Sequence, residues 1–402
     1  MPDSVDKVHS YCIHCAALCG IVAHIRDGFL VKIEGDQEST RNAGTLCPKG
    51  LAAKQEIYHP DRLKYPMKRT RPKGEEPGWK RISWDEALDT VSRKMKEFKD
   101  SCGPESFFFQ KGSTGGSSGK EWFSLYNRLV NLFGSPNFGG TGHICCYSVS
   151  CPGLPLHLGN KGQAPSVEWD KTACVLLVGS NIMHTKPNVA RRILDAQSRG
   201  VKLIVVDPML TPTASKADIW LAPRPGTDLA LFLAMHQVIV REGLHDSDFL
   251  SQWTNAPFLV RNDNGLFLRD DASRYMVWDS VTGKPCPADP WSTSGVKPSL
   301  TGSYSVDGVS YRPAWQLFCD LVEPCTPEWA EPVTWIPAAD IYNVAKLYAT
   351  TKPASVNWYN GLHKSTNSHK TSVALALLPV ITGNWDVPGG FTVDLGSKFG
   401  EI

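Results

Sequence analysis

The sequence has 402 residues, of which 42% are hydrophobic and 20% are charged, and its formal net charge is +2. This length allows two or three hydrophobic cores, because a single core stops growing at about 250–300 residues. A nearly neutral chain has no long-range electric field that would recruit nucleic acid or an anionic membrane, so we expect neither as a partner.

The first residues contain neither the basic stretch nor the apolar stretch of a secretory signal. The longest apolar runs, such as 229–240, are well short of the roughly 20 residues that cross a membrane. We therefore expect a cytoplasmic chain without direct membrane insertion. Its twelve cysteines then argue against a disulfide framework, because disulfides are rare in that compartment.

Four of these cysteines are regularly spaced near the N-terminus. Three follow the spacing Cys-x2-Cys-x3-Cys, and a fourth comes after 27 intervening residues; they are Cys12, Cys15, Cys19 and Cys47. Four thiolates in a three-plus-one grouping favour a 4Fe–4S cluster. A structural zinc site is the alternative, although zinc is usually bound by two separate pairs of cysteines.

Two local signals define elements in the first hundred residues. The alternating stretches 21–25 and 29–33 flank Asp27-Gly28, a pair that is typical of a hairpin turn. Further on, Ser83 and Glu86 form the pattern of a capping box, which predicts that a helix begins directly after Ser83.

The middle of the chain alternates strands with helices. Its strands are near-continuous apolar runs, and strand–helix–strand units of this kind indicate a parallel sheet covered on both faces. Residues 261–314 are instead rich in Gly, Pro, Ser and Asp, which indicates a β-rich insertion. The expected strands are 106–110, 173–178 and 201–206, and the expected helices are 120–133, 188–198, 228–241, 337–348 and 368–382.

Several motifs occur together in one order: CIHCAALC with CPKG, WKRISWDEALD, VLLVGSN, KLIVVDP and GNWDVPGG. This set resembles the N-terminal part of the dimethyl-sulfoxide-reductase family of molybdopterin enzymes, over most of the chain except residues 261–314. The resemblance implies an α/β fold, in which a small N-terminal β-rich iron–sulfur domain precedes Rossmann-like parallel-sheet domains with a β-rich insertion.

The same resemblance implies three domains. A 4Fe–4S cluster domain spans 1–63, and an α/β domain spans 64–165 and is completed by 350–402. A Rossmann-like domain that binds molybdopterin dinucleotide spans 166–349 and contains the insertion at about 261–314. Chains of the family are considerably longer and end in a β-barrel-like domain. That C-terminal domain is absent here, so we expect a fragment or a chain completed by another polypeptide.

Members of this family hold a 4Fe–4S cluster beside molybdenum or tungsten, which is carried by two molybdopterin guanine dinucleotides. The resemblance implies that Lys49 lies between the cluster and the pterin. It also implies that Cys145, or the adjacent Cys146, is the protein ligand of the metal, and His143 is a candidate for a hydrogen bond to substrate.

Candidate dinucleotide contacts lie around the expected parallel sheet. A loop between a buried strand and a helix can present backbone N–H groups to a pyrophosphate, and the resemblance adds the others. The expected contacts are Gly179, Ser180, Asn181, Asp207, Arg224, Gly226, Thr227 and Asp228. Met209 is a departure, since relatives commonly have an arginine there.

We therefore expect the catalytic subunit of a molybdopterin-dependent oxidoreductase, which acts on a small-molecule substrate by two-electron or oxygen-atom-transfer chemistry. Electrons would pass through the cluster, and the expected partner is an electron-transfer iron–sulfur subunit. Formate dehydrogenase is disfavoured, because Cys146 rather than a histidine follows Cys145.

Two alternatives stay open. The first is a non-redox tungsten hydratase resembling acetylene hydratase, in which an aspartate follows the second cluster cysteine; this chain has Ala16 there. The second is a bare iron–sulfur electron-transfer subunit, which would not need the dinucleotide motifs.

Overall fold

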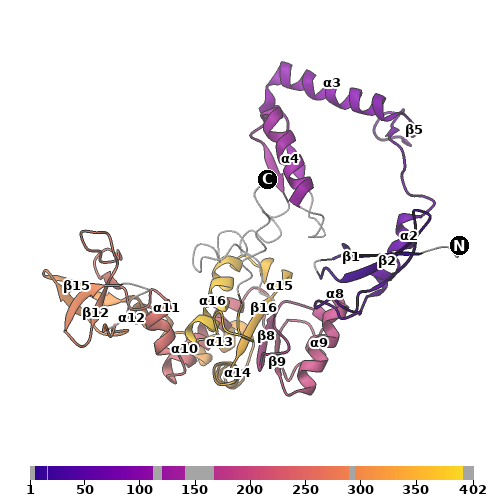
Figure 1. Cartoon of the computed structure of the whole chain (residues 1–402). Coiled ribbons are helices and arrows are strands. Elements are labelled where there is room, and N and C mark those ends of the chain that lie inside the picture. Colours follow the sequence, from indigo (N-terminus) through magenta and orange to yellow (C-terminus); the bar gives the residue numbers. More distant parts are fainter. Residues whose placement is uncertain (1–4, 16, 112–119, 141–166, 289–294, 393–402) are drawn as a thin grey trace. The chain divides into compact units, whose positions relative to one another are not determined.

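The computed structural model describes residues 5–15, 17–111, 120–140, 167–288 and 295–392. Contacts divide the chain into two compact units, which we describe separately (Figure 1). The first unit comprises residues 1–144 and 186–191, and the second comprises 145–185 and 192–402. No helix in the described ranges is long and apolar enough to cross a membrane.

The first unit begins with a three-stranded antiparallel sheet of order β1-β2-β3. Its strands are β1 (Asp6–Tyr11), β2 (Gly20–Arg26) and β3 (Phe29–Gly35). Asp27 and Gly28 both have positive φ, at 51° and 79°, as a two-residue hairpin turn requires. The predicted turn is therefore confirmed. Two short helices follow, α1 (Pro48–Leu51) and α2 (Ala53–Ile57).

The rest of the first unit contains the long helix α3 (Trp84–Cys102). The Ser83 hydroxyl accepts from the Glu86 amide at 3.1 Å, so this half of the predicted capping box is confirmed. The Glu86 carboxylate instead accepts from Lys68 at 3.1 Å. Beyond α3, helix α4 connects two parallel strands. The elements around these helices are β4 (Met67–Lys68), β5 (Lys80–Arg81), η1 (Pro104–Ser106), β6 (Phe109–Lys111), α4 (Lys120–Phe133) and β7 (Phe138–Gly140).

A four-stranded parallel sheet of order β10-β9-β8-β16 forms the centre of the second unit. Its strands are β8 (Cys174–Val178), β9 (Lys202–Val206), β10 (Ile219–Leu221) and β16 (Ala354–Trp358). Every residue of β8 is buried, which explains its continuous apolar sequence. The chain proceeds from β8 through β9 to β10, and then adds β16 on the other side of β8. The order of strands therefore reverses between β8 and β16, which is the switch point where ligands bind in such sheets.

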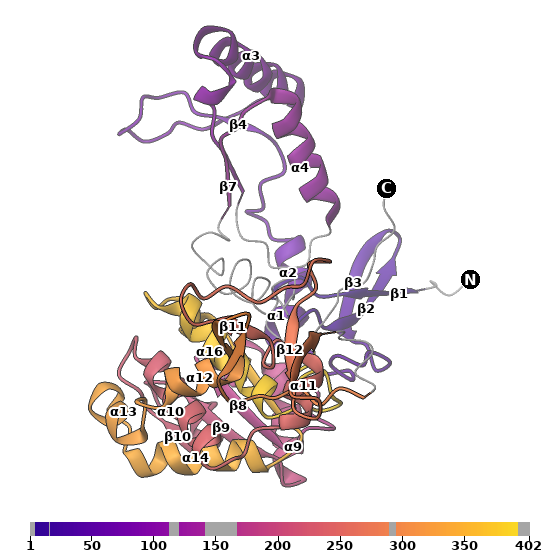
Figure 2. The ribbon, with the colours of Figure 1, turned by 90° about the vertical axis from the view of Figure 1, so that its left-hand side faces the viewer.

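Helices pack around this sheet and complete the core. Helix α10 contacts α12, α13, α14 and α16 (Figure 2). Its Phe232 and Met235 are fully buried. The helices are α8 (Ile182–Thr185), α9 (Pro187–Ser198), η2 (Ala214–Lys216), α10 (Asp228–Arg241), α11 (Ser247–Trp253), α12 (Ala314–Val322), α13 (Pro327–Thr334), α14 (Ala338–Thr350), α15 (Asn360–His363) and α16 (Ser368–Ile381).

Short antiparallel strands fill the range in which the sequence indicates an insertion. They form a sheet of order β11-β15-β14 and a separate pair, β12-β13. The strands are β11 (Leu259–Arg261), β12 (Met276–Asp279), β13 (Lys284–Pro287), β14 (Tyr304–Val306) and β15 (Val309–Pro313). The expected α/β class with its N-terminal antiparallel strands is confirmed.

Strand β16 lies in the range 350–402, which the sequence analysis groups with residues 64–165. Here it pairs with β8 over its whole length, from Ala354 opposite Cys174 to Trp358 opposite Val178. The pairing buries Trp358 completely, so this strand belongs to the central sheet of the second unit.

Candidate functional site

Three of the four spaced cysteines lie in the loop that joins β1 to β2. Cys12 follows the last residue of β1 and Cys19 precedes the first residue of β2. The Cys12 amide donates to the Cys19 carbonyl at 2.8 Å, and Tyr11 pairs with Gly20, so the antiparallel ladder closes the loop. The hairpin thus brings the first and third cysteines together at its end.

The segment that ends in Cys47 is joined to this loop by hydrogen bonds of Asn42, a buried residue that none of the sequence motifs includes. The Asn42 side chain accepts from the Gly20 amide at 2.7 Å and donates to the Gly20 carbonyl at 3.0 Å. It also donates to the Thr45 carbonyl at 2.9 Å. Asn42 therefore ties the segment that ends in Cys47 to the start of β2. An isolated asparagine in a loop carries no sequence signal for this role.

The four thiols influence one another electrostatically. Burial, with a smaller contribution from Cys12, Cys15 and Cys47, raises the pKa of Cys19 to about 11. Burial also raises the pKa of Cys12, which the nearby Lys49 ammonium lowers. Cys12, Cys15 and Cys19 therefore share one loop, and Cys47 and Lys49 lie near enough to affect the pKa of Cys12.

This arrangement fits a cluster with four iron ligands. Among the residues that the structure describes, no three His, Cys, Asp or Glu side chains are close enough to hold a single metal ion. The chemistry of the donor set, four thiols, is that of an iron–sulfur cubane.

A second cation lies near the cysteines, on a segment distant in sequence. Lys186 groups with the first unit, and its ammonium is largely buried. Burial lowers the pKa of Lys186, and the Cys15 thiol raises it. The sequence analysis did not identify this lysine, because nothing local relates residue 186 to the N-terminal cysteines.

The expected dinucleotide contacts gather at one edge of the parallel sheet in the second unit. The carboxyl ends of parallel strands meet at the same edge, so the residues after β8, β9 and β10 lie together. Gly179 follows β8, Asp207 follows β9, and the turn that ends at Asp228 follows β10.

Gly179 makes a close contact that admits no side chain. Its φ is +55°, and a Cβ atom built on it would lie 2.7 Å from the Leu362 amide nitrogen. The Gly179 amide donates to the Val206 carbonyl at 2.9 Å, and its carbonyl accepts from the Gly361 amide at 3.0 Å. The loop is therefore held between β9 and α15, with its backbone near the switch point.

The rest of this loop is anchored by Asn181. Its side-chain oxygen accepts from the Thr213 hydroxyl at 3.0 Å, and Thr213 also accepts from the Met183 amide. The helix predicted at 188–198 is confirmed as α9, and the four-residue helix α8, which was not predicted, lies between the loop and α9. Any attraction for phosphate comes from the backbone N–H groups of the loop, since α8 is too short to contribute much dipole.

Two carboxylates, Asp207 after β9 and Asp228 after β10, lie at the same edge. Burial raises the pKa of Asp228, and the charge of Asp207 raises it further. Asp207 accepts from the Met209 amide at 3.0 Å, while the Met209 side chain is exposed. A carboxylate at the end of such a strand suits the hydroxyl donors of a ribose, and the second suits the N–H donors of guanine.

Arg224, Gly226 and Thr227 form the turn that leads into α10. The Thr227 hydroxyl donates to the Arg224 carbonyl at 2.6 Å, and Gly226 has a φ of +84°. The Arg224 guanidinium lies over the Trp335 ring, 5.5 Å from its centroid. The turn therefore positions Asp228 as the first residue of α10 and leaves Arg224 exposed at the edge of the site.

Three predicted residues, His143, Cys145 and Cys146, lie outside the residues that the structure describes. Their roles at the metal stay predictions.

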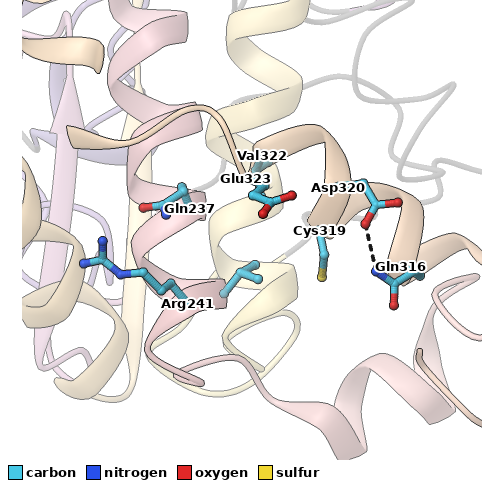
Figure 3. A pocket seen from close by; sticks show the side chains of 8 residues that line it. Gln237, Arg241, Gln316, Cys319, Asp320, Val322 and Glu323 are labelled. Atoms are coloured by element: carbon cyan, nitrogen blue, oxygen red, sulfur yellow. Dashed lines mark hydrogen bonds between the residues drawn. The ribbon is translucent and has the colours of Figure 1, made fainter. Parts of the chain in front are cut away.

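A cavity of about 420 Å³ lies elsewhere in the second unit, between the end of α10 and α12 (Figure 3). It is lined by Gln237, Val240, Arg241, Gln316, Cys319, Asp320, Val322 and Glu323. Arg241 and Asp228 are at opposite ends of α10, which separates them by about 20 Å at 1.5 Å per residue. No residue singled out in the sequence lines this cavity, so we do not assign the dinucleotide to it.

The fold and the gathered residues define a class of protein that holds an iron–sulfur cluster and binds a dinucleotide on a Rossmann-like sheet. Residues 62–392 match the family model described as molybdopterin oxidoreductase, and residues 5–59 match the molybdopterin oxidoreductase Fe4S4 domain. The chain belongs to the molybdopterin oxidoreductase family. Membership implies a 4Fe–4S cluster and a molybdenum or tungsten bis-pterin cofactor.

Several known proteins are similar to this chain. A sulfite dehydrogenase subunit of Allochromatium vinosum is 29% identical, over 96% of this chain and 43% of that protein. A putative dimethyl sulfoxide reductase catalytic subunit of Halobacterium salinarum is 31% identical, over 92% of this chain and 46% of that protein. Among solved structures, acetylene hydratase from Pelobacter acetylenicus matches with a TM-score of 0.70 and 26% identity, over 94% of this chain and 44% of that one. The chain thus spans less than half the length of these relatives.

Proposed function

We propose that this chain is the N-terminal part of the catalytic subunit of a molybdenum or tungsten bis-pterin oxidoreductase, with two-electron or oxygen-atom-transfer chemistry on a small-molecule substrate. The observation that carries the proposal is the gathering of Cys12, Cys15, Cys19 and Cys47 beside Lys49. When bound, the pterin-held metal supplies the redox chemistry, and the protein positions and tunes it.

The cysteine loop and Lys49 serve the electron path in this proposal. The four thiolates hold the 4Fe–4S cluster, and the hairpin between β1 and β2 fixes three of them relative to one another. Lys49 places a positive charge next to Cys12. A fixed cation beside the cluster stabilises its reduced, more negative form, which favours electron transfer through this point.

The carboxyl edge of the sheet binds one molybdopterin guanine dinucleotide in the same proposal. Gly179 lets the backbone approach the diphosphate, which the N–H groups of Ser180 and Asn181 would face, while Asp207 and Asp228 accept from ribose and guanine. The turn of Arg224, Gly226 and Thr227 closes the guanine end. The proximity of the two carboxylates, together with the close approach of Gly179 and Gly361, supports this assignment.

Metal ligation rests on the sequence alone. Cys145 is the proposed thiolate ligand of the metal, with Cys146 as the adjacent alternative, because a thiolate suits a soft metal that bears pterin sulfurs. His143 is a proposed hydrogen-bond donor to substrate.

A non-redox hydratase is the second candidate. The solved structure of acetylene hydratase is similar over nearly the whole chain, which favours it. Ala16 argues against it, because it replaces the aspartate that the hydratase carries after its second cluster cysteine. The names of the other relatives favour the oxidoreductase.

The proposal also includes a partner and a location. Electrons entering or leaving the cluster need an acceptor or donor, and an iron–sulfur electron-transfer subunit fits this need. The cytoplasmic location is likewise a proposal, which cell fractionation of the native protein would test.

Elemental analysis of anaerobically purified protein tests the core of the proposal. We expect about four irons per chain, the number in one cubane, together with molybdenum or tungsten. Cys19→Ser should lose the iron, whereas the exposed Cys102→Ser should keep it. Zinc in place of iron would overturn the assignment of the cysteines. Iron without molybdenum or tungsten would keep the cluster and refute dinucleotide binding by this chain alone.

A further inference from the structure

The switch point of the parallel sheet is bounded on one side by β16 and the short helix that follows it. The Tyr359 amide donates to the Val178 carbonyl at 3.2 Å, and the Gly361 amide donates to the Gly179 carbonyl at 3.0 Å. Helix α15 is thereby fastened to the loop that follows β8. Its last residue is His363, and none of the motifs discussed above includes it.

His363 is a buried histidine whose hydrogen-bonding capacity is unused. Its exposed fraction is 9%, and neither Nδ1 nor Nε2 has a hydrogen-bond partner in the described part of the chain. Burial lowers the pKa of His363 to about 4, so the ring is neutral near pH 7 and offers one donor and one acceptor. Buried polar groups are almost always hydrogen-bonded, so a doubly unpaired ring in this position needs an explanation.

Other buried polar groups of the second unit differ from His363, which has both ring nitrogens unpaired. His236 is also fully buried, but only its Nδ1 lacks a partner, because its Nε2 is 2.8 Å from the Ala374 carbonyl oxygen. Trp358, which ends β16, has a buried Nε1 without a partner in the described part of the chain. The unsatisfied groups of Trp358 and His363 thus lie on β16 and the helix directly after it, at the carboxyl edge where Gly179 also lies.

We propose that His363 is a binding residue for the polar edge of a fused heterocycle, the pterin or the guanine of the dinucleotide. Both rings carry an amino group and a carbonyl on one pyrimidine ring, which together present hydrogen-bond donors next to an acceptor. A neutral imidazole, with one donor and one acceptor, complements such an edge, whereas a phosphate would call for a cation. This inference rests on the proposed function, since it requires that the chain bind the dinucleotide.

The test compares His363→Leu and His363→Gln with His236→Leu as the matched control. Each full 402-residue chain is purified anaerobically from a host that makes molybdopterin guanine dinucleotide and from one that does not. The readouts are pterin and guanine nucleotide released per chain, the affinity of the cofactor-free chain for GMP, and its thermal midpoint.

We expect His363→Leu to weaken cofactor retention by about tenfold for each hydrogen bond lost. The thermal midpoint of cofactor-free His363→Leu should be unchanged or higher, because that substitution removes no hydrogen bond from the cofactor-free fold. His363→Gln should retain more cofactor than His363→Leu, since it keeps a donor and an acceptor. His236→Leu should show the opposite pattern, with a lower midpoint and normal cofactor content.

The outcomes separate the possible failures. Weaker GMP binding by His363→Leu would identify guanine as the partner, and lower pterin content with normal GMP binding would identify the pterin. The inference would be overturned if His363→Leu kept wild-type pterin content and wild-type GMP binding. It would also be overturned if the thermal midpoint of cofactor-free His363→Leu fell enough for unfolding to explain the lost cofactor. If the unmodified chain itself holds no dinucleotide, the proposed function fails and this inference fails with it.

Discussion

Asn42 and Gly20 are joined by two hydrogen bonds, of 2.7 and 3.0 Å, that connect the Cys47 segment to the end of the cysteine loop. Neither residue is a cluster ligand. The pair fixes the fourth cysteine relative to the other three, which lie on the hairpin between β1 and β2. Correct ligand spacing at the cluster therefore depends on a residue that touches no iron.

Asn42→Ala is expected to lower the iron content strongly while most of the chain stays folded. The substitution leaves the Gly20 amide unpaired, at a cost of about 1–3 kcal/mol, and frees the Cys47 segment. The Gly20 carbonyl still accepts from the Asp36 amide at 3.0 Å. Iron per chain and the charge-transfer absorption of the cluster measure the effect. Asn264→Ala, at an exposed turn of the insertion, is the control and should keep its iron. Full iron in Asn42→Ala would show that Cys47 is positioned without this side chain.

Gly179→Ala is expected to destabilise the second unit and to abolish dinucleotide binding. The added Cβ would lie 2.7 Å from the Leu362 amide nitrogen, and φ is +55°. Gly243→Ala is the matched control, because its φ is +63° and nothing lies within 4 Å of its Cβ. The free energy of unfolding of the control should fall only by the cost of placing an alanine at positive φ, about 1–2 kcal/mol. Chemical denaturation measures both, and equal losses in the two variants would contradict a steric role for Gly179.

Asp228→Asn is expected to weaken GMP binding at least tenfold with little change in stability. The substitution replaces one of the two acceptor oxygens for guanine N–H groups by an amide donor. It also removes a carboxylate whose pKa is raised by burial and by Asp207. Isothermal titration with GMP measures the loss. Asp340→Asn, in the first turn of α14, controls for the interaction of an aspartate with a helix dipole. Equal GMP affinity in both variants would remove Asp228 from the nucleotide site.

The stability of the second unit is expected to fall below about pH 6.5 because of His236. Burial lowers the pKa of His236 from 6.5 to about 4, with a smaller opposing effect from the Ala374 carbonyl. The unfolded chain therefore binds this proton more tightly, so stability is full above pH 6.5 and decreases as the pH falls toward 4. The decrease amounts to at most about 3.5 kcal/mol, at about 1.4 kcal/mol for each pKa unit. Urea denaturation of His236→Gln should show a shallower pH dependence, and an unchanged slope would refute the assignment.

Local sequence signals determined the elements that depend on neighbouring residues. Helices α4 and α10 begin and end at the residues that apolar periodicity predicted, and the Asp27-Gly28 turn adopts the predicted positive φ angles. The spacing of the four cysteines likewise predicts that three of them share one loop, as they do between β1 and β2. In each case the relevant interactions lie within a few residues, so composition and spacing record them directly.

Tertiary structure alone decided the relationships between distant segments. Nothing in the sequence around Asn42, Lys186 or His363 indicates the loop, thiol or sheet edge that each residue meets. The same holds for β16, whose pairing with β8 joins residues 180 positions apart, from Cys174 to Ala354. Such contacts form because the whole chain minimises exposed apolar surface and unpaired backbone groups together. That free energy is shared over many segments, so no single stretch of sequence records the partner it will have.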